Sequence, residues 1–191
     1  DINHMLDFGL FNKASEQISK RLNLINFGEA NSLYEIKDKF NINYLAPTST
    51  RELISKKLKF DLVMSTNTLE HFKVSELKSL IADMNVLLND KAIISSIIDY
   101  SDHYSHTDKN ISPLNFLKYS DEEWEKFNNK YLYQNRLRHL DYKDLFLQNS
   151  FRIVKEIIGD KFINKSNFYK RFINRKDSNI LWGYYLVQKQ L

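Results

Sequence analysis

The segment between residues 60 and 98 constrains the fold most, because it predicts a strand, a helix and a second strand in succession. Leu62, Val63 and Met64 form an apolar run inside the first predicted strand, 60–65, and residues 93–98 form a β-branched second strand. Between the strands, apolar residues recur on one helical face, at Leu77, Leu80, Ile81, Met84, Leu87 and Leu88. A unit of this kind implies two parallel strands with a right-handed crossover.

Further elements are predicted on both sides of this unit. They are helix 8–24, strand 42–45 and helix 51–57 before it, and helices 121–129 and 142–148 and strands 151–158 and 180–188 after it. Capping boxes are expected at Ser49 with Glu52 and at Ser120 with Glu123, and Asp141 is expected to cap helix 142–148. Since only a polar, basic connection joins the last two strands, we expect them to pair antiparallel.

The composition excludes several classes of protein. The chain has no cysteine, which rules out a disulfide framework, a thiolate metal site and a cysteine nucleophile. No apolar run approaches the roughly 20 residues of a membrane helix, and no signal peptide is recognisable at the start, so we expect a cytoplasmic protein with no membrane partner. The net charge of +4 is a mild excess. We interpret the basic stretch 161–176 as a solvated loop, so a nucleic-acid partner is disfavoured, and salt-dependent retention on RNA or DNA would test that alternative.

A motif at the first strand of the central unit points to a known family. Residues 60–72, FDLVMSTNTLEHF, have the pattern F-D-hydrophobic-hydrophobic, then small or polar residues, then L-E-H. This pattern resembles the fourth strand and the following turn of class I S-adenosylmethionine (SAM)-dependent methyltransferases. Residues 98–108, IDYSDHYSHTD, resemble a subgroup of that family, as do Trp124 and residues 133–138, YQNRLR.

The resemblance implies an α/β, Rossmann-like fold in a single domain spanning residues 1–191. We expect a sheet that is mostly parallel and ends in a C-terminal antiparallel strand pair. SAM is the implied cofactor, and methyl transfer to a small-molecule acceptor is the implied reaction. The chain's oligomeric state does not follow from this family.

One departure from the family concerns its Gly-rich loop, which approaches the methionine portion of SAM after the first strand. No G-x-G pattern occurs here, and the glycines at 9, 28, 159 and 183 stand alone. Either the first strand and its loop are absent from this chain, which we favour, or SAM binds in another way. With the first strand absent, the resemblance places Asp1 near the acid that accepts hydrogen bonds from the ribose hydroxyls; a frayed terminus is the alternative.

Other cofactor contacts are expected just after the predicted strands, because ligands bind at the carboxyl ends of strands in such sheets. Thr48 follows strand 42–45 and is a candidate for the adenine. Ser65, Thr66 and Asn67 follow strand 60–65 and are candidates for the sulfonium end. Ordinary turn hydrogen bonds are the alternative for all four.

The segment 99–108 concentrates proton-handling groups just beyond the second strand of the unit. We predict His103 as general base, with His106 second and with Asp99 or Asp102 orienting the imidazole. A polar surface loop that caps neighbouring helices is the alternative. His71 is a further catalytic candidate, although packing over the sheet end is the more common role for such a residue.

A metal site is the less favoured interpretation of the same histidines. Glu70, His71, His103 and His106 are donors that suit Zn, Fe or Mn, and some RNA 2′-O-methyltransferases of this fold carry a Glu/His metal site at the corresponding turn. Asn67 stands where the first glutamate of that motif belongs, and we therefore predict no metal.

Acceptor binding is assigned to polar residues near the same end of the sheet. The candidates are Tyr100, Tyr104, Asn135, Arg136 and Arg138. The two arginines suit an anionic group on the acceptor, because a guanidinium binds such groups through paired hydrogen bonds. Ion pairs with Asp141 or Asp144 are the alternative. Two other functions stay open: a catalytically inactive methyltransferase-like interaction module, and a metal-assisted RNA methyltransferase.

Overall fold

The computed structural model describes residues 32–163 and 167–190, and the chain divides into two compact units, residues 1–48 and 49–191. In the first unit, helix α3 (Leu33–Phe40) begins after Ser32, whose hydroxyl accepts a hydrogen bond from the Glu35 amide at 3.2 Å. The predicted strand 42–45 is wrong, because these residues form no strand and Ile42 and Tyr44 are exposed. The predicted helix 8–24 lies outside the described residues.

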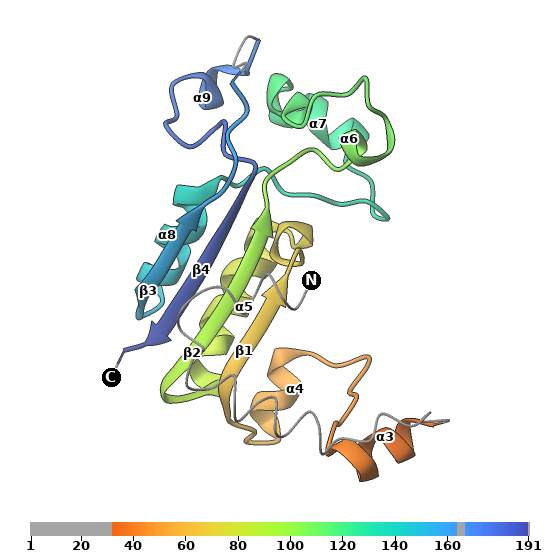
Figure 1. Cartoon of the computed structure of the whole chain (residues 1–191), viewed down its shortest axis with the longest axis vertical. Helices are drawn as coiled ribbons and strands as arrows, with labels where there is room; N and C mark the ends of the chain where they lie inside the picture. Colours follow the sequence, from red (N-terminus) through yellow and green to blue (C-terminus); the bar gives the residue numbers. More distant parts are fainter. Residues whose placement is uncertain (1–31, 164–166, 191) are drawn as a thin grey trace. The chain divides into compact units, whose positions relative to one another are not determined.

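A four-stranded mixed sheet forms the centre of the second unit (Figure 1). Its strands are β1 (Phe60–Thr66), β2 (Leu88–Asp99), β3 (Phe151–Ile158) and β4 (Trp182–Lys189), in the order β1-β2-β4-β3. β1 and β2 are parallel, whereas β4 runs antiparallel to both β2 and β3. The predicted α/β fold, its parallel unit and its closing antiparallel pair are therefore confirmed, although among the described strands the parallel pair is outnumbered by the antiparallel pairs.

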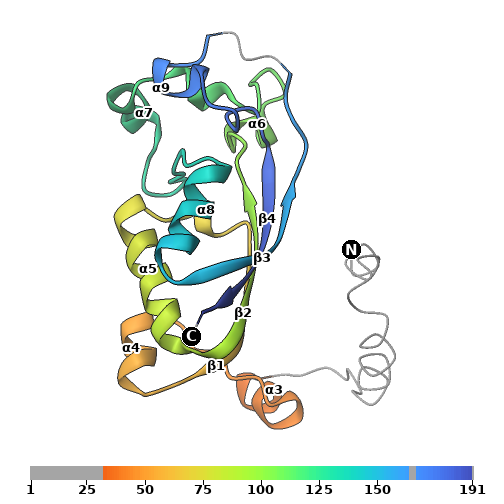
Figure 2. The same ribbon diagram turned by 90° about the vertical axis from the view of Figure 1, so that its left-hand side faces the viewer.

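Three helices cover one face of this sheet: α4 (Thr50–Ser55), α5 (Val74–Leu87) and α8 (His139–Gln148) (Figure 2). The predicted apolar stripe of α5 is buried at Leu77, Ile81, Met84 and Leu87. The chain then passes directly into β2, so Leu88 belongs to the strand, which starts earlier than predicted. Leu77, Ile81 and Met84 of this stripe belong to the hydrophobic core that the helices form with the sheet.

Helix α8 begins at His139, three residues before the predicted start. Asp141 is therefore not the N-cap. Its carboxylate instead reaches back to the amide of the N-cap residue Arg138, which donates to it at 2.8 Å. At α7 (Asp121–Phe127), by contrast, the predicted capping box is confirmed, since Ser120 and Glu123 exchange both hydrogen bonds.

Within the described part of the second unit, the opposite face of the sheet carries no helix (Figure 2). Leu62 and Met64 of β1 are 53% and 62% exposed, as expected for strand residues that alternate away from the covered face. β1 also pairs only with β2 within the described part of the chain. No helix in that part is long and apolar enough to cross a membrane.

Short helices gather beyond the carboxyl end of β2 (Figure 1). They are α6 (Tyr104–Thr107), η2 (Asn115–Lys118), α7 and α9 (Lys170–Ile173). They enclose a second apolar core made of Leu114, Phe116, Leu117, Trp124, Phe168 and Phe172. This packing gives the segment that follows β2 a fixed shape at the end of the sheet where β1 also terminates.

Candidate active site

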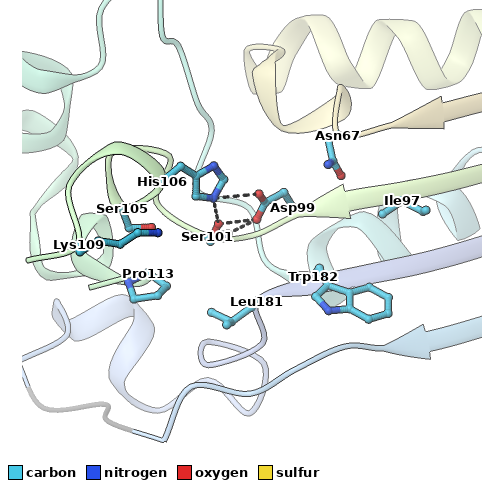
Figure 3. Close-up of a pocket in the computed structure, with 10 residues that line it drawn as sticks. All are labelled: Asn67, Ile97, Asp99, Ser101, Ser105, His106, Lys109, Pro113, Leu181 and Trp182. Atoms are coloured by element: carbon cyan, nitrogen blue, oxygen red, sulfur yellow. Dashed lines mark hydrogen bonds and ion pairs between the residues drawn. The ribbon is translucent and has the colours of Figure 1, made fainter. Parts of the chain in front are cut away.

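An open pocket of about 470 Å³ lies at the carboxyl ends of β1 and β2 (Figure 3). Asn67 contributes from the turn after β1, Asp99, Ser101 and His106 from the end of β2 onward, and Trp182 from the start of β4. The position agrees with the expectation that the parallel pair would present its ligand site at this edge.

Asn67 holds the turn after β1 in a specific conformation. Its backbone has φ of 48°, in the left-handed region, which asparagine tolerates better than most residues. Its amide donates to the backbone oxygen of Ile97 at 3.0 Å, so the turn is fixed to β2. Nearby, the hydroxyl of Ser65 is buried without a hydrogen-bond partner, and Thr66 is exposed.

Asp99 is the centre of the polar contacts in the pocket (Figure 3). Its Oδ1 accepts hydrogen bonds from the Ser101 amide at 2.7 Å and from the Ser101 hydroxyl at 2.6 Å. Its Oδ2 lies 3.4 Å from His103 Nε2 and 3.5 Å from His106 Nε2. Burial alone would raise the pKa of Asp99, but the contacts from His103 and Ser101 outweigh it and hold that pKa below its ordinary value. Asp99 is therefore an ionised carboxylate within ion-pair distance of two imidazoles.

His106, and not His103, lines the pocket. The exposed imidazole of His106 also contacts the Ser101 hydroxyl, with Nε2 at 3.0 Å. His103 is half-buried behind it, with its ring stacked on His106 at 5.0 Å and edge-on to His71 at 4.9 Å. The adjacent Asp99 carboxylate raises the pKa of His103. The structure thus brings together the predicted histidines and Asp99, with His106 at the pocket and His103 behind it, while the catalytic order of the two imidazoles stays a prediction.

Asp102 organises the loop that follows β2. It is fully buried, and its carboxylate accepts from the Tyr104 amide at 3.0 Å and from Asn115 Nδ2 at 3.4 Å. Burial raises the pKa of this carboxyl. Asp99 contacts both imidazoles, whereas the described hydrogen bonds of the Asp102 carboxylate go to its own loop and to Asn115.

The two tyrosines predicted to bind the acceptor are used by the fold. Tyr100 is 1% exposed, and its hydroxyl lies 3.2 Å from His139 Nδ1. Tyr104 donates its hydroxyl to the backbone oxygen of Phe127 at 3.0 Å. Neither side chain lines the pocket beside Asp99.

The predicted anion-binding arginines are buried and donate to backbone oxygens. Arg138 is fully buried and donates to the oxygens of Tyr100 at 2.6 Å, Ser178 at 3.1 Å, and Ile180. Arg136 donates to the oxygens of Phe116 at 2.9 Å and Tyr119 at 2.6 Å and pairs with Asp121.

The side chain of Asn135 is also used within the fold. Its amide donates to the backbone oxygens of Leu69 and Phe72, each at 3.1 Å. The assignment of Asn135, Arg136 and Arg138 to acceptor binding is therefore not retained, because their donors hold the chain together. Lys109 is the cation that lines the pocket, and the charge pattern of 99–108 did not single it out.

The remaining candidates lie elsewhere. Thr48 belongs to the first compact unit, so its relation to the pocket stays a prediction. Asp1 lies outside the described residues. His71 is exposed beside Glu70, which is 1% exposed and whose carboxylate oxygens have no hydrogen-bond partner among residues 32–163 and 167–190. Burial raises the pKa of Glu70 to about 7.

Comparison with known proteins gives distant structural likenesses. No family model matches the chain, and no curated protein matches it. A SAM-dependent methyltransferase from Archaeoglobus fulgidus is similar at 15% identity and a TM-score of 0.47, covering 83% of this chain and 73% of the other.

A S-adenosylmethionine-dependent methyltransferase from Clostridium acetobutylicum ATCC 824 gives 14% identity and a TM-score of 0.48, with 83% and 71% of the two chains covered. Magnesium protoporphyrin IX methyltransferase from Synechocystis PCC 6803 gives 12% identity and a TM-score of 0.39, with coverage of 70% of this chain and 46% of that one. The chain thus spans less than half the length of the Synechocystis protein.

Proposed function

We propose that the chain is part of a SAM-dependent methyltransferase in which the pocket beside Asp99 receives the methyl acceptor. The observation that carries the proposal is the contact of Asp99 with His106 at 3.5 Å, placed where the parallel strands β1 and β2 end. The motif FDLVMSTNTLEHF supports it independently, since its Asn67 lines the same pocket. When bound, SAM supplies a methyl group attached to a positively charged sulfur.

The carboxyl end of β1 suits the polar methionine portion of SAM. Ser65 has a buried hydroxyl that the fold leaves without a hydrogen-bond partner, and the exposed side chain of Asn67 lies on the pocket wall. Both groups can donate and accept hydrogen bonds. We assign Ser65 and Asn67 to that portion of the cofactor, while Asp1 and Thr48 remain the predicted contacts of its ribose and adenine.

We assign the role of general base to His106. Asp99 and Ser101 both contact Nε2, which makes Nε2 the protonated nitrogen of the neutral ring and leaves the lone pair on Nδ1. Asp99, held ionised, stabilises the imidazolium that forms when Nδ1 takes a proton from the acceptor. His103 stacks on His106 and fixes the plane of its ring.

The acceptor is best described as a small molecule with an anionic group. Lys109 lines the pocket near His106 and carries the positive charge that the arginines were expected to supply.

Calorimetric titration of SAM and of its demethylated product tests the proposal, using this chain and the full-length product of its gene. Binding to the full-length protein is expected, with a loss of affinity in Asn67→Gly, which keeps the left-handed backbone and removes the amide. Asn174→Gly, an exposed asparagine at the end of α9, is the matched control. Lack of binding to either form would reject the enzyme and favour an interaction module.

A further inference from the structure

Three potential metal ligands converge beside the pocket without lining it. One donor atom each from Glu70, His71 and His103 lies within 4.8 Å of the other two. Glu70 and His71 come from the turn η1 (Leu69–His71) after β1, and His103 comes from the loop after β2. From this arrangement we propose that Glu70, His71 and His103 bind one divalent transition-metal ion, such as Zn²⁺ or Mn²⁺.

The carboxylate of Glu70 is the strongest indication of a ligand. The side chain is 1% exposed, and neither oxygen has a hydrogen-bond partner in the described part of the chain. A buried carboxyl without partners is costly, because it has lost its hydration and gained nothing in exchange. A metal ion between Glu70 and the two imidazoles would replace the lost hydration with direct coordination.

The turn that carries Glu70 is held in place by Asn135. The Asn135 amide donates to the Glu70 backbone oxygen at 2.8 Å, and its side chain donates to the oxygens of Leu69 and Phe72. Asn135, in turn, accepts from the Tyr142 hydroxyl at 3.0 Å. These bonds fix the backbone on both sides of the carboxylate, as a preorganised ligand requires.

The imidazole of His71 is oriented for coordination. Its Nδ1 lies 2.9 Å from the backbone oxygen of Tyr133, which can only accept, so Nδ1 carries the proton and Nε2 keeps a lone pair. Metal-binding histidines commonly donate their other N–H to a carbonyl or a carboxylate in this manner. Asp99, 3.4 Å from His103, is the corresponding outer carboxylate for the second histidine.

The donor set selects the class of metal. Two imidazoles and one carboxylate suit Zn²⁺, Mn²⁺ or Fe²⁺, whereas Mg²⁺ and Ca²⁺ prefer oxygen donors. Tetrahedral ligands about 2.1 Å from Zn²⁺ lie roughly 3.4 Å apart. Side-chain rotations that bring these donor atoms about 1 Å closer complete the site and leave a coordination position for water or an acceptor oxygen.

Metal binding is testable without SAM or an acceptor, so its outcome is separate from that of the methyltransferase proposal. Zn²⁺ and Mn²⁺ are titrated calorimetrically into full-length protein freed of metal with a chelator, and Mg²⁺ is titrated as the comparison. One equivalent of Zn²⁺ or Mn²⁺ is expected to bind, and to raise the unfolding temperature of the protein.

Two ligand variants and two controls locate the ion. Glu70→Gln and His71→Ala are each expected to lower the affinity by more than the roughly 10–100-fold that loss of an outer-shell partner costs. Because His71 is exposed, His71→Ala should fold normally, and it therefore tests the site even if the change at the buried Glu70 disturbs folding. Asp90→Asn and Glu125→Gln, which each remove an exposed carboxylate elsewhere on the unit, should bind as the native protein does. No binding by the native protein, or equal binding in all variants, overturns the site.

Discussion

Arg138 Nη1 donates to the backbone oxygen of Tyr100 across 2.6 Å, which joins the start of α8 to the end of β2. The same guanidinium reaches the backbone oxygens of Ser178 and Ile180, just before β4. Burial lowers the pKa of Arg138 to about 10, so the side chain remains charged at neutral pH. One buried cation thus joins the start of α8, the end of β2 and the residues just before β4.

Arg138→Met should therefore destabilise the protein strongly. It removes a buried charged donor and leaves backbone oxygens without partners, a loss expected to cost about 3–5 kcal/mol. Denaturant unfolding followed by circular dichroism measures the change. Arg152→Met, at an exposed arginine on β3 that pairs with Gln188, should stay within about 0.5 kcal/mol. Similar losses for both variants would contradict the role given to Arg138.

Gly183 is required by close packing at the start of β4. A Cβ there would lie 2.5 Å from His139 Nδ1 and 2.7 Å from the Tyr100 hydroxyl, and both side chains are buried. Gly183→Ala should therefore cost about 1–3 kcal/mol of unfolding free energy. At Gly159 the added carbon meets the half-exposed Trp182 ring, which has room to move, so Gly159→Ala should cost less. Thermal unfolding of the pair measures the difference, and a reversed order would refute this explanation.

His139 should make the stability depend on pH. Burial lowers the pKa of His139, although Glu156, 2.7 Å away, opposes this effect. The unfolded chain therefore takes up the proton on this imidazole at a higher pH than the folded chain does. The contribution of neutral His139 to the free energy of unfolding is thus present above the ordinary histidine pKa and is lost as the pH falls below it.

The unfolding free energy of native protein relative to His139→Gln is therefore expected to shrink between pH 7.5 and pH 5. Denaturant unfolding of both proteins across that range measures it. A difference that grows on acidification would show that the folded protein favours the charged imidazole instead.

His106→Ala should lower the rate of methyl transfer without weakening SAM binding. Loss of a general base typically costs about 10²–10⁴ in rate. The measurement is transfer of labelled methyl from SAM into the small-molecule fraction of a cell extract by the full-length protein. Thr107→Ala, the exposed next residue of α6, is the control. An unchanged rate in His106→Ala would remove this residue from the reaction.

The sequence predicted the strands and helices that carry a strong apolar pattern. The α5 stripe and both closing strands were found because each buries apolar residues against a partner within the same unit. Strand 60–65 was found from its apolar run, although Leu62 and Met64 are exposed in the structure. The stretch 42–45 has a similar local composition, but a strand also needs a neighbour to pair with, and local composition does not contain that information.

The site could be predicted as a region but not as an arrangement of side chains. His103 and His106 are three residues apart, and the single turn of α6 decides which imidazole lines the pocket. The contacts of the two arginines could not be predicted either. Arg138 reaches the backbone oxygens of Ser178 and Ile180, about forty residues further along the chain, and Arg136 reaches those of Phe116 and Tyr119, which precede it. Hydrogen bonds to backbone oxygens cannot be predicted from residue types, because every residue carries such an oxygen.

The position of Asp99 between two imidazoles has a thermodynamic consequence. Its Oδ2 contacts both His103, in the proposed metal site, and His106, in the pocket. An ion bound to His103 changes how strongly this imidazole interacts with the shared oxygen, and thereby how strongly that oxygen holds His106. By linkage, whatever factor a bound metal applies to acceptor affinity, the acceptor must apply to metal affinity. The affinity of the metal ion and the affinity of the acceptor would then depend on each other through a single carboxylate oxygen.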